Sequence, residues 1–184
     1  TLQRLGFQVT LLMNADQRRM ESTIRDFGGQ LRQRKGVGLF YYAGHGMQLN
    51  GENYLLPTDI NPSSEEDVRY DAIPLGKLLA QMQVAKNTMN VVILDACRNN
   101  PFPKSFRTFN PGLVQVNAAA GTFISFATAP GQVAADGEGT NGLFTGNLLR
   151  HIDTPDIKIE EVFKRTTADV YRESNQRQAP WVQY

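Results

Sequence analysis

The chain has 184 residues and a nearly balanced charge, with 19 Lys and Arg against 18 Asp and Glu. This length and an ordinary globular composition predict one domain, and the charge balance gives no electrostatic reason to expect nucleic acid or a membrane surface as the partner. One Cys and two His exclude an internal disulfide and a Cys-rich structural zinc site, and no apolar run approaches the ~20 residues that span a bilayer.

The beginning of the chain predicts a strand, a helix and a second strand. Residues 7–13 form an apolar run of β-formers between Gly6 and Asn14, typical of a buried strand. Asp16 can cap the helix that follows. Residues three and four apart mark the apolar face of that helix: Met20, Ile24, Phe27 and Leu31. Residues 37–43 are continuously apolar, which suits a strand covered on both faces.

The middle of the chain predicts a hairpin, a loop, a helix and a third strand. Asn50-Gly51 between β-like flanks is a strong hairpin signal. Residues 58–72 are polar and are expected to form a surface loop. The next helix has its apolar face at Leu75, Leu78, Leu79 and Met82. Residues 91–94 are expected to be a buried strand.

The last part of the chain predicts one more strand and two helices. Residues 98–117 contain three Pro and no clear period, so they are expected to be a long loop, which is usually functional or mobile. Residues 122–128 predict a strand, 130–142 a Gly-rich loop, and 143–152 and 159–174 two helices. Strands alternating with helices predict an α/β fold whose mainly parallel sheet is covered on both faces.

Two of the predicted strands run into residues that can carry chemistry. One ends at His45, between two glycines, and the other at Asp95-Ala96-Cys97. Ligands of parallel sheets bind outside the carboxyl ends of the strands, so His45 and Cys97 are expected at one edge if the two strands are neighbours. Alone, a single Cys is more often a small buried hydrophobe and a His beside Gly a turn residue, but their joint placement favours a functional pair.

The pair suits nucleophilic attack on an amide. A Cys97 thiolate can attack the carbonyl carbon, and the His45 imidazole can give a proton to the leaving amine. The developing oxyanion needs donors, and the N–H groups of Gly46 and Cys97 are candidates.

Acidic residues near Cys97 suggest a pocket for a cationic side chain. Asp95 has two interpretations, a structural cap at a strand end or a carboxylate that pairs with Arg or Lys. Asp136 and Glu138 in the Gly-rich loop could add to such a pocket. Arg98 points to the opposite option, a pocket for an acidic side chain, although a surface or loop-tethering role is favoured for it.

At this point a family resemblance becomes specific. The stretches FYYAGHG…NYLLPTD and VVILDACRNNPF resemble the His and Cys motifs of caspase-fold cysteine peptidases, above all the paracaspase branch and its bacterial relatives, the orthocaspases. The separation of 52 residues between His45 and Cys97 is close to the ~50 of caspases. FISFATAPGQVAADGEGTNGLFTGNLLRHI resembles the small-subunit part of that fold.

The resemblance implies a three-layer αβα sandwich formed by one caspase-like domain over residues 1–184. About 1–100 would correspond to the large subunit, 98–117 to the intersubunit loop and 118–184 to the small subunit. The family fold also has a strand and a helix before residue 7. Because the chain opens abruptly, that piece is expected to have been removed, to be disordered or to belong to another chain.

The resemblance also implies the roles of individual residues. His45 and Cys97 match the catalytic dyad, and the N–H groups of Gly46 and Cys97 match the oxyanion hole. Asp95 matches an acidic residue of the primary specificity pocket, and Asp136 matches a second one. Aspartate-specific caspases carry Gln where this chain has Asp95, so the implied substrates are proteins or peptides with Arg, or Lys, before the cleaved bond.

Further expectations concern processing, cofactors and partners. Self-cleavage is a hypothesis, with Lys104 and Arg107 as a further place for it. No cofactor or metal is expected, because the acidic run 65–67 suits a solvated loop better than a calcium site. A homodimer through a sheet edge is one option for a partner, and a lone thiol nucleophile favours the cytoplasm.

Two other functions compete with an endopeptidase. A non-catalytic caspase-like scaffold is one, but such relatives usually lose the His or the Cys, and this chain keeps both. A hydrolase of small amides is the other, and it would be indicated by an alkylating probe that labels Cys97 when no peptide is cleaved.

Overall fold

The computed structural model describes residues 1–97, 113–116, 119–129 and 141–184. In chain order its helices and strands are α1 (Gln17–Arg34), β1 (Val37–Leu49), β2 (Glu52–Leu55), α2 (Glu65–Asp71), β3 (Ile73–Pro74), α3 (Leu75–Ala85), β4 (Met89–Cys97), β5 (Thr122–Phe126), α4 (Leu143–His151), α5 (Ile159–Glu173) and β6 (Trp181–Gln183).

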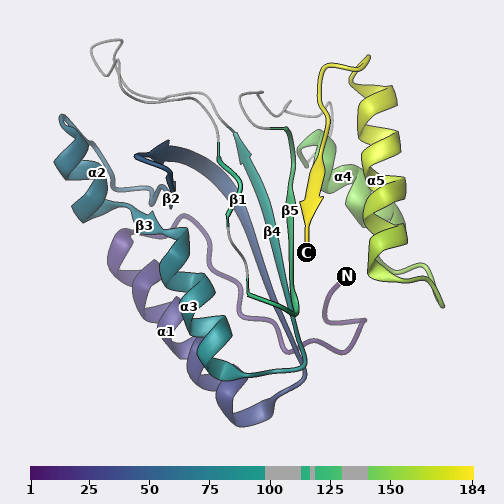
Figure 1. Cartoon of the computed structure of the whole chain (residues 1–184), viewed down its shortest axis with the longest axis horizontal. Helices are drawn as coiled ribbons and strands as arrows, with labels where there is room; N and C mark the ends of the chain where they lie inside the picture. Colours follow the sequence, from purple (N-terminus) through teal and green to yellow (C-terminus); the bar gives the residue numbers. More distant parts are fainter. Residues whose placement is uncertain (98–112, 117–118, 130–140) are drawn as a thin grey trace.

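The strands form one six-stranded sheet in the order β3-β2-β1-β4-β5-β6 (Figure 1). The central strands β1, β4 and β5 are parallel, and antiparallel pairs extend the sheet on both sides, β2 and β3 beyond β1 and β6 beyond β5. The predicted α/β class is therefore confirmed, with the parallel pairs at the centre of a mixed sheet.

The sheet lies between two helical layers. Side chains of a strand alternate between faces, and β4 shows this directly. Val92 and Leu94 belong to the apolar cluster that includes residues of α1 and α3, whereas Val91 and Ile93 belong to the cluster that includes residues of α4 and α5. Figure 1 shows α1 and α3 together on one side of the sheet and α4 and α5 on the other. These positions on β4 therefore mark the two sides of a three-layer sandwich.

Local sequence explains how the helices are held. The Asp16 side chain caps α1 by accepting a hydrogen bond from the Arg19 N–H at 2.7 Å, as predicted.

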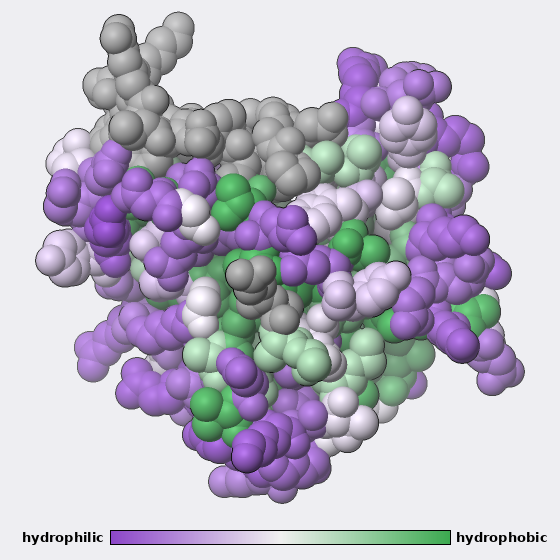
Figure 2. Space-filling view, viewed as in Figure 1, coloured by the Kyte–Doolittle hydropathy of each residue, from purple (hydrophilic) through white to green (hydrophobic). Residues whose placement is uncertain are grey.

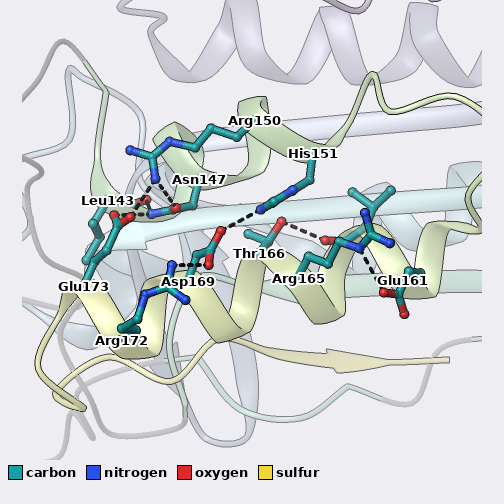
Figure 3. Close-up of polar contacts among 11 residues, drawn as sticks. Leu143, Asn147, Arg150, His151, Glu161, Arg165, Thr166, Asp169, Arg172 and Glu173 are labelled. Carbon is teal, nitrogen blue, oxygen red and sulfur yellow. Dashed lines mark hydrogen bonds and ion pairs between the residues drawn. The ribbon is translucent and has the colours of Figure 1, made fainter.

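Polar contacts join α4 to α5 (Figure 3). Arg150 Nη1 donates to Glu173 Oε1 at 2.6 Å, and His151 Nε2 lies 2.7 Å from Asp169 Oδ2.

The predicted hairpin is confirmed between β1 and β2. Asn50 and Gly51 have φ values of 52° and 83°, the left-handed backbone that a tight two-residue turn requires. The turn reverses the chain so that Gly46 to Leu49 pair antiparallel with β2. Beyond this hairpin, the predicted helices α1, α3, α4 and α5 and the strands β1, β4 and β5 are all present, with ends that differ by a few residues.

Two local predictions were wrong, and one strand was missed. Residues 7–13 are not a strand, because none of the strands in the described ranges pairs with them and a strand without a hydrogen-bonded neighbour is not stable in water. Residues 58–72 are not all loop, because Ser64 and Asp67 form a capping box that starts α2. The strand that was missed is β6. It follows Pro180 and pairs with β5.

The surface is mixed in character. Figure 2 shows polar residues over most of one face, with apolar side chains gathered towards its middle. None of the helices in the described ranges combines the length and apolar character needed to cross a membrane.

Candidate active site

The parallel pairing of β1 with β4 brings His45 and Cys97 together. The two strands keep one register over nine residue pairs, from Val37 opposite Met89 to His45 opposite Cys97. Neighbouring strands are about 4.8 Å apart, so the backbones of the two residues are adjacent. His45 is exposed. The pair stands at the carboxyl end of β4 and at the end of the part of β1 that pairs with β4, because β1 itself continues to Leu49. The structure describes only the backbone of Cys97.

Hydrogen bonds fix the backbone at His45. Its carbonyl oxygen accepts from the Leu56 N–H at 3.0 Å and from the Tyr42 hydroxyl at 2.7 Å. Burial raises the pKa of Tyr42, so that the hydroxyl stays a donor. A Cβ at Gly44 would lie 2.6 Å from the Tyr42 oxygen, so only glycine fits there without displacing this tyrosine. The glycine before His45 therefore permits the contact that anchors the imidazole-bearing residue.

Gly46 is buried directly after His45. A Cβ at this position would lie 3.1 Å from Leu113 Cδ2 and 3.2 Å from Ala96 Cβ. The backbone of Gly46 is therefore packed between Ala96, which precedes Cys97 on β4, and Leu113. Sequence reasoning proposed the Gly46 N–H as an oxyanion donor, and the close packing gives that backbone a fixed position.

Asp95 lies two residues before Cys97 and opposite Ala43. Its carboxylate oxygen Oδ2 accepts from Thr145 Oγ1 on α4 at 2.5 Å. The Thr145 oxygen is also 2.7 Å from the Tyr41 hydroxyl. Burial raises the pKa of Tyr41, the Thr145 hydrogen bond opposes this rise, and the Asp95 charge adds to it. Asp95 is therefore joined to the helical layer of α4 and α5.

Strand alternation relates His45 to this group of polar side chains. Tyr41 and His45 are four residues apart on β1, so their side chains belong to the same face of the sheet. That face carries α4, because Tyr41 contacts Thr145. His45 and the carboxylate of Asp95 thus belong to one side of the sheet, near the carboxyl end of β4.

Several predicted site residues lie outside the described residues. These are Arg98, the pocket candidates Asp136 and Glu138, and the cleavage candidates Lys104 and Arg107. Within the described ranges, no group of three or more His, Cys, Asp or Glu side chains could hold a metal ion.

Sequence reasoning missed four residues that support the site. Tyr41 and Thr145 contact each other and lead to Asp95, and no sequence signal distinguished Thr145 from other helical threonines. Asn53 and Gln183 hold residues 113–116, which include the Leu113 that packs against Gly46. Asn53 carried a signal, because a polar residue within the otherwise apolar NYLL of a strand must find a partner when it is buried.

Asn53 and Gln183 act as clamps at the two ends of this segment. Asn53 Nδ2 donates to the Val114 carbonyl at 2.8 Å, and Asn53 Oδ1 accepts from the Val114 N–H at 2.7 Å. Gln183 Oε1 accepts from the Val116 N–H at 3.4 Å, and Gln183 Nε2 donates to the Val116 carbonyl. Two side-chain amides therefore satisfy the backbone of residues that belong to no strand.

Comparison with known proteins agrees with this architecture. The chain matches the caspase domain of the C14 peptidases over residues 1–184. It is 30% identical over 153 residues to mucosa-associated lymphoid tissue lymphoma translocation protein 1 of Homo sapiens and equally to the homolog of Mus musculus. The matched region covers 82% of this chain but 17% of each relative, so the chain corresponds to a small part of those proteins. The match across the whole chain shows that this protein belongs to the caspase-domain family of peptidases.

Proposed function

We propose that this domain is a cysteine endopeptidase that cleaves peptide bonds after Arg or Lys through a dyad of Cys97 and His45. The observation that carries the proposal is the β1–β4 register, which pairs His45 with Cys97 at one sheet edge. Membership of the caspase-domain family supports peptidase chemistry there. Neither the match nor the curated relatives' names state a substrate, so the specificity is argued from Asp95.

The proposed reaction has two stages. The Cys97 sulfur attacks the scissile carbonyl carbon, forming a C–S bond and an oxyanion that the N–H groups of Gly46 and Cys97 stabilise. The C–N bond then breaks, and the amine leaves with the proton that His45 took from the Cys97 thiol. In the second stage His45 takes a proton from water, whose oxygen attacks the acyl-enzyme. The C–S bond breaks and releases the carboxylic acid, and His45 returns its proton to the Cys97 sulfur.

Asp95 supplies the proposed preference for a basic residue. A half-buried carboxylate pairs with guanidinium in a bidentate geometry and with ammonium as a point charge. Asp136, which lies outside the described residues, is proposed as the second acid of this pocket.

Further proposals concern processing, assembly and location. We propose that residues 98–117 separate a large-subunit-like part from a small-subunit-like part, with Lys104 and Arg107 as self-cleavage sites. We also propose that two copies pair through a sheet edge and that the domain works in the cytoplasm.

A peptide library with Arg, Lys or Asp before the scissile bond tests the proposal on purified protein. We expect cleavage after Arg and Lys, and its abolition in Cys97→Ala and His45→Gln. His151→Gln is the matched control, since it alters the other His of the chain, and it should retain cleavage. Asp95→Ala should reduce cleavage after Arg more than cleavage after a neutral residue, because the cation loses its partner.

Other outcomes would reject parts of the proposal. Cleavage only after Asp would overturn the basic preference. Absence of any cleavage would favour a scaffold, unless an alkylating probe labels Cys97, which would favour a hydrolase of small amides. For self-cleavage, N-terminal sequencing that finds the same ends in wild type and Cys97→Ala would reject the hypothesis.

A further inference from the structure

A chain of two hydroxyls leads to the Asp95 carboxylate from two other elements. Tyr41 on β1 is 2.7 Å from the Thr145 oxygen on α4, and Thr145 Oγ1 is 2.5 Å from Asp95 Oδ2 on β4. These contacts link positions 104 and 50 residues apart in the sequence. They therefore depend on the packing of α4 against the sheet.

The direction of the hydrogen bonds follows from the number of protons. An ionised carboxylate only accepts, and a threonine hydroxyl has one proton to donate. Thr145 donates this proton to Asp95, so Tyr41 must donate to the Thr145 oxygen. The raised pKa of Tyr41 agrees with a tyrosine that stays protonated. Both hydroxyls are thus polarised towards one end of the chain, the Asp95 carboxylate.

Neither hydroxyl has an evident role in building its own element. Thr145 is inside α4, whose N-cap is Gly142, so its side chain is not the cap. Tyr41 is partly exposed at 40% and would be satisfied by water without Thr145. The arrangement is explained if the position of the carboxylate matters, because a hydrogen bond from a helix restricts the rotamers of an Asp side chain.

We propose that Thr145 and Tyr41 are positioning residues that fix the orientation of the Asp95 carboxylate for a cationic substrate side chain. This inference rests on the proposed function, and it makes α4 part of the specificity apparatus. A carboxylate held by a charge-assisted hydrogen bond is preorganised for the cation, so less binding free energy is lost when the substrate orders it.

Two peptides that differ only in Arg or citrulline before the scissile bond isolate the effect of charge. Thr145→Val keeps the shape of the side chain and removes the hydroxyl. We expect kcat/KM for the Arg peptide to fall about tenfold in this variant, mainly through KM, while the citrulline peptide changes less than about twofold. Thr145→Ser should restore the selectivity for Arg, and Tyr41→Phe should reduce it by a smaller factor.

Two controls separate positioning from loss of structure. Thr167→Val makes the same change on the neighbouring helix α5 and should leave both peptides unaffected. In an Asp95→Asn background, Thr145→Val should have no further effect on the Arg/citrulline ratio, because residues acting through one group are not additive. Equal losses on both peptides in Thr145→Val, or an unchanged ratio, would overturn the inference.

Binding of benzamidine, followed by NMR, tests the inference without turnover. Weaker binding to Thr145→Val than to wild type and Thr145→Ser is expected. If no peptide is cleaved but this difference in binding persists, the proposed function fails and the positioning role stands. If Arg peptides are cleaved and Thr145→Val equals wild type in both assays, the positioning role fails alone. Absence of both cleavage and benzamidine binding in wild type would overturn both.

Discussion

The clamp between Asn53 and Val114 makes a quantitative prediction about stability. Asn53 has no exposed surface, and its amide group makes both a donor and an acceptor bond with the backbone of Val114, at 2.8 and 2.7 Å. Asn53→Ala removes both bonds at once and leaves the N–H and C=O of Val114 without these partners.

The expected loss can be worked out from that geometry. An unpaired buried polar group costs about 1–3 kcal/mol, and two such groups would give about 2–6 kcal/mol. Val114 is only half-buried, so water restores part of the hydrogen bonding. We therefore expect the free energy of unfolding to fall by about 2–3 kcal/mol. Asn53→Asp should cost at least as much at neutral pH, because a carboxylate cannot donate to the Val114 carbonyl and its charge is buried.

Equilibrium unfolding in urea and amide hydrogen exchange measure the two sides of this prediction. The Val114 amide should exchange faster in Asn53→Ala, since its acceptor is removed. Asn61→Ala is the control, because Asn61 is exposed and its loss should change stability by less than about 0.5 kcal/mol. An Asn53→Ala protein as stable as this control, with a Val114 amide still protected, would refute the reasoning.

Three further predictions concern packing, pH and metal. Gly46→Ala should lower the free energy of unfolding by about 1–3 kcal/mol, because the new Cβ overpacks against Leu113. Leu113→Ala should relieve part of this loss, so strictly additive changes in the free energy of unfolding would contradict the contact. The His151 hydrogen bond, followed by Arg172, holds the pKa of Asp169 below its ordinary 3.8. The stabilisation that the ionised Asp169 gives to the fold is therefore complete above pH ~4, and it is lost as the pH falls through the lowered pKa of Asp169. Asp169→Asn should reduce the decrease in Tm that occurs at acid pH. A decrease as large as in the wild type would contradict the contact between Asp169 and His151. Activity on Arg peptides should persist in a chelator, whereas loss restored by calcium would show a metal requirement.

Sequence patterns predicted those parts of the fold that depend on local order. Apolar runs identified the strands at 37–43 and 91–94, and helical spacing identified α1 and α3. The run at 7–13 is also rich in β-formers, but the strand predicted there is absent, because β-propensity describes a residue's fit to a sheet and not the presence of a neighbouring edge. A strand prediction from one sequence thus states that a segment can pair, and the available partner decides whether it does.

The short elements show a different limit. The capping box of α2 was readable at Ser64 and Asp67, but the polar composition of 58–72 hid a helix that buries only Val68. The strand β6 has three residues, too few for an alternation to be recognised. Elements of this size form because tertiary neighbours stabilise them, and a single sequence does not contain that information.

The candidate site divides in the same way. His45, Cys97 and Asp95 were found because each lies at the end of an apolar run, and the parallel register then made two of them neighbours. Thr145 could not be found, because its contact with Asp95 depends on how α4 packs on the sheet.

The register that joins His45 to Cys97 is itself protected by Asp95. A slip of one residue turns every side chain of a strand to the opposite face. Both faces of β4 are apolar through Val91, Val92 and Ile93, so these residues alone would tolerate such a slip. The slip would, however, move the Asp95 carboxylate from Thr145 into the apolar cluster of α1 and α3, at the cost of an unpaired buried charge. The same carboxylate that we propose to bind the substrate therefore also disfavours the pairing in which the proposed dyad would be lost.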